Sequence, residues 1–173
     1  MTWAKLSASL EPYALHRKIF GFDTFDGFPE LTHKDLKSTE HQDLQEGALK
    51  SHPDIFQELV ECIEEFDKHR YLNKYCKVKL VKGDVSETIP SFLKDNPHVL
   101  VALLYMDFDL YKPTKMALQH FLPRIPKGGV IAFDEVNNEY WAGETIAMLE
   151  ELNLNNFILK KFDFDPNVAY IVL

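Results

Sequence analysis

Cysteine, glycine and long apolar runs are scarce in this chain of 173 residues. The two cysteines, Cys62 and Cys76, are too few for a disulfide framework, and the first residues lack the features of a secretory leader, so we expect a cytoplasmic protein. No apolar run approaches the roughly 18 residues that a membrane-spanning helix needs. The basic residues form no block and the net charge is −8, which argues against binding to nucleic acid or to anionic membranes.

The rest of the composition is that of a globular protein. The apolar fraction is 46%, and 13 phenylalanines supply large side chains for a core. A chain of this length fits one domain, so we expect residues 1–173 to fold as a single unit.

Helical and strand patterns alternate along the chain. We expect helices at 2–10, from Pro53 through Phe66, at 86–94, from Pro113 onward and at 139–152, and strands at 17–23, 77–83, 99–106, 130–134, 156–164 and 167–173. The spacing of the second helix places Cys62 on its apolar face, as a small core residue. This alternation predicts a doubly wound, Rossmann-like α/β fold with a mostly parallel sheet.

Two strands carry more detailed expectations. Strand 99–106 is nearly all apolar, which is typical of a parallel strand covered on both faces. Asp165-Pro166-Asn167 predicts a tight turn, so the last two strands should form an antiparallel hairpin. By contrast, residues 24–51 are polar and irregular, and a connection of that length is expected to be functional or mobile.

Carboxylates follow four of the predicted strands at the point where each strand ends. They are Asp23, Asp84, Asp107 with Asp109, and Asp134 with Glu135. Because ligands of doubly wound sheets bind at the carboxyl ends of the strands, we expect these side chains to share one rim. A single acid in such a place is usually a helix cap or a turn residue, but several like charges on one rim repel one another unless a cation or ligand offsets them.

The residue types at this rim indicate two kinds of ligand. Asp107, Asp134 and Glu135 offer only hard oxygen atoms, which suit Mg²⁺ or another hard divalent cation better than zinc. Asp23 can accept hydrogen bonds from both hydroxyls of a ribose. Asp84 could accept from an adenine amine with Val85 packing on the ring, although an N-cap of helix 86–94 explains Asp84 equally well.

Four motifs in order resemble the macrocin O-methyltransferase family of class I methyltransferases. They are Gly-Phe-Asp-Thr-Phe-Asp-Gly-Phe-Pro-Glu (21–30), Lys-Gly-Asp-Val (82–85), Met-Asp-Phe-Asp-Leu-Tyr-Lys-Pro-Thr (106–114) and Pro-Lys-Gly-Gly-Val-Ile-Ala-Phe-Asp-Glu (126–135). The resemblance covers nearly all of the chain from Trp3 and implies S-adenosylmethionine-dependent methylation of a hydroxyl on a sugar or glycosylated small molecule.

The same resemblance implies residue roles. Asp23 would bind ribose, Asp84 and Val85 would contact adenine, and the three acids Asp107, Asp134 and Glu135 would bind the metal. Residues 26–51 would form a lid over the acceptor. It assigns no general base, because related enzymes use a histidine in a C-terminal region and none follows His120 here; Asp109 and Tyr111 are candidates by position only.

One departure from the family pattern bears on activity. Class I methyltransferases begin with a strand and a glycine-rich turn that receives the cofactor, whereas this chain begins at what resembles the helix after that turn. The missing strand is normally central, between strands 17–23 and 99–106, so its loss exposes two backbone edges and favours association of copies. If the two strands instead pair directly, we expect a six-stranded sheet with weak or no cofactor binding.

Three other interpretations compete with the enzyme hypothesis. A non-catalytic or N-terminally truncated methyltransferase-like protein would keep the carboxylates without the turn. A metal-dependent glycosyltransferase could use Asp107-Phe108-Asp109 as an Asp-x-Asp motif. A haloacid-dehalogenase-type phosphatase fits poorly, because Asp23-Thr-Phe-Asp26 has one residue too many.

Overall fold

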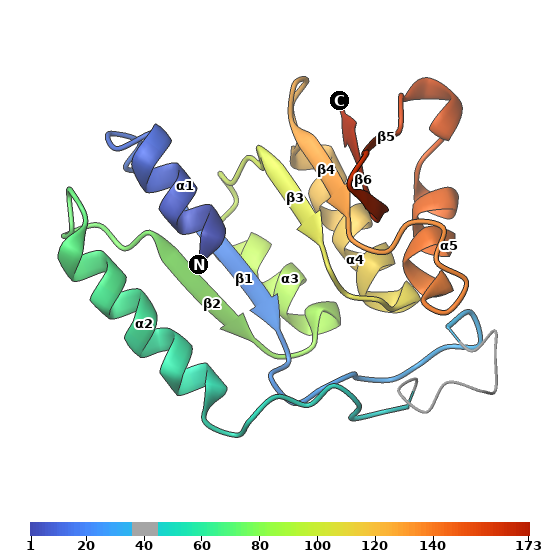
Figure 1. Ribbon diagram of the computed structural model, residues 1–173, viewed down its shortest axis with the longest axis horizontal. Coiled ribbons are helices and arrows are strands. Elements are labelled where there is room, and N and C mark those ends of the chain that lie inside the picture. Colours follow the sequence, from blue (N-terminus) through green and yellow to red (C-terminus); the bar gives the residue numbers. More distant parts are fainter. Residues whose placement is uncertain (36–44) are drawn as a thin grey trace.

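The computed structural model describes residues 1–35 and 45–173 as helices and strands in alternation (Figure 1). The helices are α1 (Thr2–Leu10), α2 (Ile55–His69), α3 (Val85–Asp95), α4 (Tyr111–Phe121) and α5 (Ala142–Glu151), with 3-10 turns η1 (Leu122–Arg124) and η2 (Leu154–Asn156). The strands are β1 (Ile19–Asp23), β2 (Val78–Lys82), β3 (Leu103–Met106), β4 (Val130–Phe133), β5 (Lys160–Phe162) and β6 (Asp165–Val172).

The strands form a two-stranded sheet and a four-stranded sheet. β1 pairs in parallel with β2, and the larger sheet has the order β3-β4-β6-β5. Within it β3 and β4 are parallel, whereas β6 runs antiparallel to both β4 and β5. The predicted α/β fold and its closing antiparallel hairpin are therefore confirmed.

The two sheets are not joined into one. In the described part of the chain β1 has only β2 as a hydrogen-bonded neighbour, and β3 has only β4. Figure 1 shows β1 on the side of its sheet nearer to β3. The direct pairing that would give a six-stranded sheet is thus absent, and each of these strands keeps an unpaired backbone edge.

A shared aromatic core holds the two sheets together. Phe92 of α3 packs against Phe20 and Phe22 of β1, at ring-centroid distances of 4.7 and 5.3 Å. Phe22 also lies 5.9 Å from Phe121 of α4. These rings belong to the same cluster as the buried Ile131 of β4, so burial of apolar surface joins sheets whose backbones do not pair.

The opposite face of the two-stranded sheet is covered by α1 and α2. Ala4 and Ile63 pack there with Val78 of β2 in a second, smaller cluster. The first turn of α1 also reaches the larger sheet, because Trp3 lies 5.8 Å from the ring of Tyr105 on β3.

In the described residues no helix is both long and apolar enough to cross a membrane.

Three local expectations are wrong. β3 is shorter than 99–106 and is not covered on both faces, since Leu103 and Tyr105 are 38% and 37% exposed beside the open strand edge. Cys62 is exposed, because α2 buries little more than Ile63. The hairpin turn lies at residues 163–164, and residues 165–167 belong to β6, where stacking of Phe162 on Phe164 and Tyr170 accompanies the pairing.

Candidate functional site

The carboxyl ends of β1, β3 and β4 bring four of the predicted acids to one rim. Asp23 ends β1, Asp107 follows β3, and Asp134 and Glu135 follow β4. The pKa of Asp107 is raised, first by burial and then by the charges of Asp134, Glu135 and Asp23, which are near enough to act on it. The common rim therefore exists, and its like charges disfavour full ionisation.

Asp109 lies deeper than a surface turn residue. Its backbone has a φ of 60°, a left-handed conformation that aspartate tolerates better than most residues. Burial first, and then the charges of Asp107, Glu135 and Asp134, raise its pKa to about 6. Asp109 therefore lies among the rim acids, where its carboxylate is a candidate for accepting a proton.

Asp134 and Glu135 already have hydrogen-bond donors. The Tyr105 hydroxyl donates to Asp134 Oδ1, and burial followed by this bond raises the pKa of Tyr105. Asn138 Nδ2 donates to Glu135 Oε2 at 2.6 Å. Within residues 1–35 and 45–173, no group of three or more histidine, cysteine, aspartate or glutamate side chains is arranged to hold a metal ion.

Glu144, in the first turn of α5, is a rim residue that the sequence interpretation missed. It is fully buried, and its Oε1 accepts from the backbone N–H of Glu135 at 3.1 Å, whereas its Oε2 is buried and has no hydrogen-bond partner among residues 1–35 and 45–173. Burial is the largest cause that raises its pKa to about 8. Helical spacing could have revealed it, because Glu144 lies on the same stripe as the buried Ala147 and Met148.

The residues that the resemblance assigns to adenosine binding differ in their exposure and in the hydrogen bonds that they already make. Asp84 is the N-cap of α3, with Oδ1 accepting from Ser86 N at 2.7 Å, so the structural alternative is realised. Val85 is only 4% exposed and belongs to the main core. Asp23 is exposed, and its Oδ1 accepts from Phe25 N at 2.7 Å in the turn after β1. Asp23 is thus the adenosine-binding candidate that a ligand can reach.

The loop after β1 is fastened to the rim by a second missed residue, Asp35. This side chain is 2% exposed, and its Oδ1 accepts from the backbone N–H of Tyr111, the first residue of α4, at 2.6 Å. Its Oδ2 accepts from both the backbone N–H and the hydroxyl of Thr32 at 2.7 Å. Asp35 therefore caps the helix that follows Asp107 and Asp109, while residues 36–44 of the predicted lid lie outside the described residues.

A charged network extends this attachment to α5. Lys34 forms an ion pair with Glu150 and lies 4.0 Å from the ring centre of Tyr111. Glu150 also accepts from the Tyr111 hydroxyl at 2.6 Å and from Lys115 Nζ at 2.9 Å. Hydrogen bonds from Lys34, Tyr111 and Lys115, in that order, lower the pKa of Glu150 to about 2. The start of the long loop is thus held by both helices beside the rim.

Comparison with known proteins gives a consistent family. The sequence model of the macrocin-O-methyltransferase family matches residues 5–160. A curated relative from Streptomyces olivaceus, 8-demethyl-8-(2,3-dimethoxy-alpha-L-rhamnosyl)-tetracenomycin-C 4'-O-methyltransferase, is 26% identical over 120 residues, which are 69% of this chain and 42% of the relative.

Solved structures agree in fold over nearly the whole chain. The calicheamicin methyltransferase CalS11 is 36% identical with a TM-score of 0.92, and the match covers 99% of this chain and 66% of that protein. Its apo structure, described as a TDP-rhamnose 3'-O-methyltransferase, is 33% identical with a TM-score of 0.81, covering 99% and 64%. This chain therefore spans 42% to 66% of the length of these relatives.

Proposed function

The chain belongs to the macrocin-O-methyltransferase family, and from this premise we propose that it acts in the S-adenosylmethionine-dependent O-methylation of a sugar hydroxyl. The observation that supports this most is the rim where Asp23, Asp107 and Asp134 meet at strand ends. The names of the relatives, which refer to a rhamnosyl group or to TDP-rhamnose, favour a deoxysugar that is carried on a nucleotide or a small-molecule glycoside. These relatives are all methyltransferases, which favours this function over the glycosyltransferase alternative. We place the reaction in the cytoplasm.

We propose that Asp23 binds the ribose of the cofactor and that Asp84 and Val85 lie near its adenine. The exposed position of Asp23 at the end of β1 supports the first role. The cap that Asp84 makes to α3 limits its role to the remaining lone pairs of the carboxylate. When bound, S-adenosylmethionine supplies an electrophilic methyl group, and the residues of this chain would orient the acceptor oxygen toward it.

We further propose that Asp107, Asp134 and Glu135 would hold a hard divalent cation such as Mg²⁺. Their oxygen donors and mutual repulsion suit a cation, whereas the bonds from Tyr105 and Asn138 must be released before all three can serve as ligands. A bound cation would polarise the acceptor hydroxyl and lower its pKa. Asp109 remains the nearby candidate for accepting its proton, whereas the Tyr111 hydroxyl already donates to Glu150 and accepts from Lys115.

The unpaired edges of β1 and β3 bear on whether this chain can bind the cofactor by itself. In the family pattern a strand and a glycine-rich turn lie between these positions, and glycines occur here only at 21, 27, 47, 83, 128, 129 and 143. We infer that these residues by themselves bind the cofactor weakly, and that a strand and a glycine-rich turn added at this gap would complete the site. The alternative is a folded, non-catalytic relative.

The cofactor proposal is tested by titrating S-adenosylhomocysteine and following the melting temperature and the heat of binding. We expect measurable binding that Asp23→Asn weakens about tenfold, which corresponds to the loss of one charged hydrogen-bonding group. Asp26→Asn is the matched control, because Asp26 lies in the same turn, is exposed and forms ion pairs with Lys50 and Lys82. Equal affinities of the two variants would refute the role of Asp23, and no binding at any concentration would favour the non-catalytic alternative.

The metal proposal is tested by Mg²⁺ titration of the wild type, Tyr105→Phe and Asp107→Asn. Removing the Tyr105 hydroxyl frees Asp134, so we expect Tyr105→Phe to bind Mg²⁺ several-fold more tightly, whereas Asp107→Asn should abolish binding. Methyl transfer to a TDP-rhamnose acceptor, followed by mass spectrometry with and without a chelator, then measures whether the cation matters to the reaction. Identical Mg²⁺ isotherms for all three proteins would contradict the assignment.

A further inference from the structure

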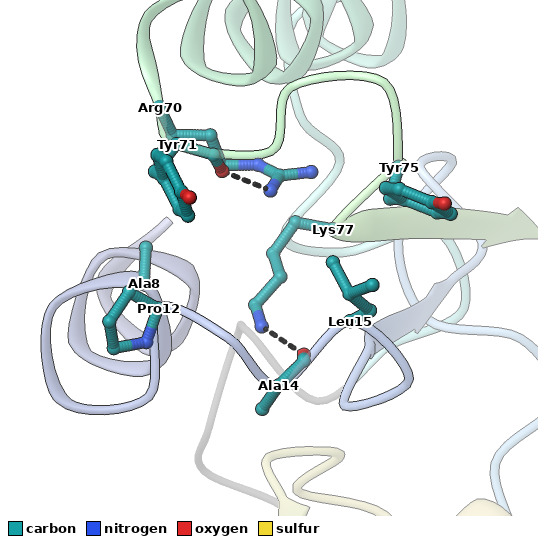
Figure 2. Close-up of a pocket in the computed structure, with 8 residues that line it drawn as sticks. All are labelled: Ala8, Pro12, Ala14, Leu15, Arg70, Tyr71, Tyr75 and Lys77. Atoms are coloured by element: carbon teal, nitrogen blue, oxygen red, sulfur yellow. Dashed lines mark hydrogen bonds between the residues drawn. The ribbon is translucent and has the colours of Figure 1, made fainter.

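A small cavity lies at the opposite end of β2 from the carboxylate rim. Its volume is about 40 Å³, and its walls come from the segment between α1 and β1 and from the connection between α2 and β2. Figure 2 shows the Arg70 and Lys77 side chains between Tyr71 and Tyr75, with the Lys77 ammonium directed at the carbonyl of Ala14. None of these residues belongs to the proposed methyltransferase site.

Two buried cations in this cavity have unused hydrogen-bond donors. Lys77 is 5% exposed, and its ammonium donates to Ala14 O at 3.2 Å, which in the described structure satisfies one of its three N–H groups. The Arg70 side chain is 10% exposed, and its Nε and Nη1 donate to Asp67 and to backbone carbonyls. Arg70 Nη2 is buried and has no hydrogen-bond partner in the part of the chain that the structure describes.

Nearby carboxylates do not balance the positive charge. Glu11 is ion-paired with Arg17, and Asp67 is ion-paired with Arg70 at 2.6 Å. Asp67 Oδ2 accepts a hydrogen bond from the backbone N–H of Lys77 at 3.3 Å, and not from the Lys77 ammonium. Burial first, and the charge of Arg70 next, lower the pKa of Lys77, and the charges of Glu11 and Asp67 only partly oppose this shift. Among the described residues, Lys77 is thus a buried cation with no carboxylate hydrogen-bonded to its ammonium, an arrangement that is costly unless another anion is present.

We propose that this cavity binds a small inorganic anion such as chloride between Lys77 and Arg70. An anion only accepts hydrogen bonds, which matches donors that lack acceptors, whereas a water molecule would also need acceptors for its own hydrogens. A cavity needs a volume of roughly 10–15 Å³ to hold one water molecule. This cavity, of about 40 Å³, therefore has room for an ion somewhat larger than water. The bound anion would fasten the α1–β1 segment onto the start of β2.

The test compares sodium chloride with sodium gluconate at equal ionic strength, because gluconate is too large for the cavity. When chloride is at roughly ten times its Kd, we expect the melting temperature to be about 3 °C higher in chloride than in gluconate, and this difference should keep growing with the logarithm of the chloride concentration. Lys77→Met should remove this chloride-specific increase in melting temperature. In gluconate the variant should be nearly as stable as the wild type, because the uncompensated charge of Lys77 destabilises the wild type there. Lys79→Met, which changes an exposed lysine of β2, should keep the increment.

A second measurement does not depend on the variants folding. Crystals of the wild-type chain soaked in sodium bromide should show an anomalous peak within hydrogen-bond distance of Lys77 Nζ or Arg70 Nη2. An identical melting response to chloride and gluconate, retention of the full increment by Lys77→Met, or a bromide-soaked cavity that holds only water would each overturn the proposal.

Discussion

Replacing Asp35 with alanine should destabilise the protein strongly, although Asp35 lies in a long polar loop. The substitution leaves three donors without their acceptor, namely the N–H of Tyr111 and the N–H and hydroxyl of Thr32. Loss of a helix cap costs about 0.5–2 kcal/mol, and each buried donor left unsatisfied costs about 1–3 kcal/mol. Because the three bonds share one side chain and are not additive, we expect a total loss of about 3–5 kcal/mol.

The loss is measured by urea denaturation and by thermal melting. For a chain of this length, 1 kcal/mol corresponds to roughly 2–4 °C, so the melting temperature should fall by about 10 °C. Asp35→Asn should lie between wild type and Asp35→Ala, because one amide oxygen can retain either the Tyr111 bond or the Thr32 bonds but not both. Amide hydrogen exchange at Tyr111 should also accelerate in both variants.

Asp54→Ala is the matched control for this prediction. Asp54 is also an aspartate at a helix N-cap position, yet its side chain makes no capping hydrogen bond to α2 and is exposed. We expect a change within about 0.5 kcal/mol. If Asp35→Ala also stayed within about 1 kcal/mol of the wild type, or if the two alanine variants melted together, the inferred cap on α4 would be refuted.

Two further predictions concern the same attachment. Gly143→Ala should lower the free energy of unfolding, measured in urea, by about 1–3 kcal/mol. The reason is that a Cβ at this position would overlap Asp35 Oδ1 and lie 2.5 Å from Tyr111 N. A variant as stable as the wild type would show that α5 can move away from Asp35 and Tyr111 without cost. Glu150→Gln should destabilise the protein at pH 7, because hydrogen bonds from Lys34 first and Tyr111 next lower the pKa of Glu150 to about 2. Since a lowered carboxyl pKa stabilises above the unfolded-state value of about 4.3, the difference between Glu150→Gln and wild type should shrink as pH falls from about 5 to 2, and a constant difference would contradict the network.

Much of the fold could be predicted because its elements carry local signals. The spacing of apolar and polar residues predicted the five α-helices and six strands of the described residues, although strands 99–106 and 156–164 begin too early and the two 3-10 turns were not predicted. The failures arose where tertiary context decides the outcome. Leu103 and Tyr105 are apolar enough for a doubly covered strand, but their exposure depends on which strand lies beside β3. The hairpin turn lies earlier than predicted because Asp165 already pairs with Phe162, with a register shift before Ala169, and because Phe162 stacks on Tyr170.

The rim was predictable in part for the same reason. Asp23, Asp107 and Asp134 follow apolar strands directly, so strand direction alone brings them to one edge. Asp35 carries no such signal, since its partner Tyr111 lies 76 residues further along the chain. Glu144 has the helical spacing of a core residue, but its charged side chain is typical of a surface residue. Only the folded structure shows that Glu144 is buried, as its spacing indicates.

Asp35 and Glu144 differ from the strand-end acids in a way that affects how variants of this site should be interpreted. Each accepts a hydrogen bond from a backbone N–H of a segment that carries rim acids, Asp35 from the start of α4 and Glu144 from Glu135 itself. Their removal would displace the loops that position Asp107 and Glu135, and it would reduce ligand binding without any contact to the ligand. Loss of binding together with loss of stability therefore indicates a positioning acid, whereas loss of binding at unchanged stability indicates one that touches the ligand.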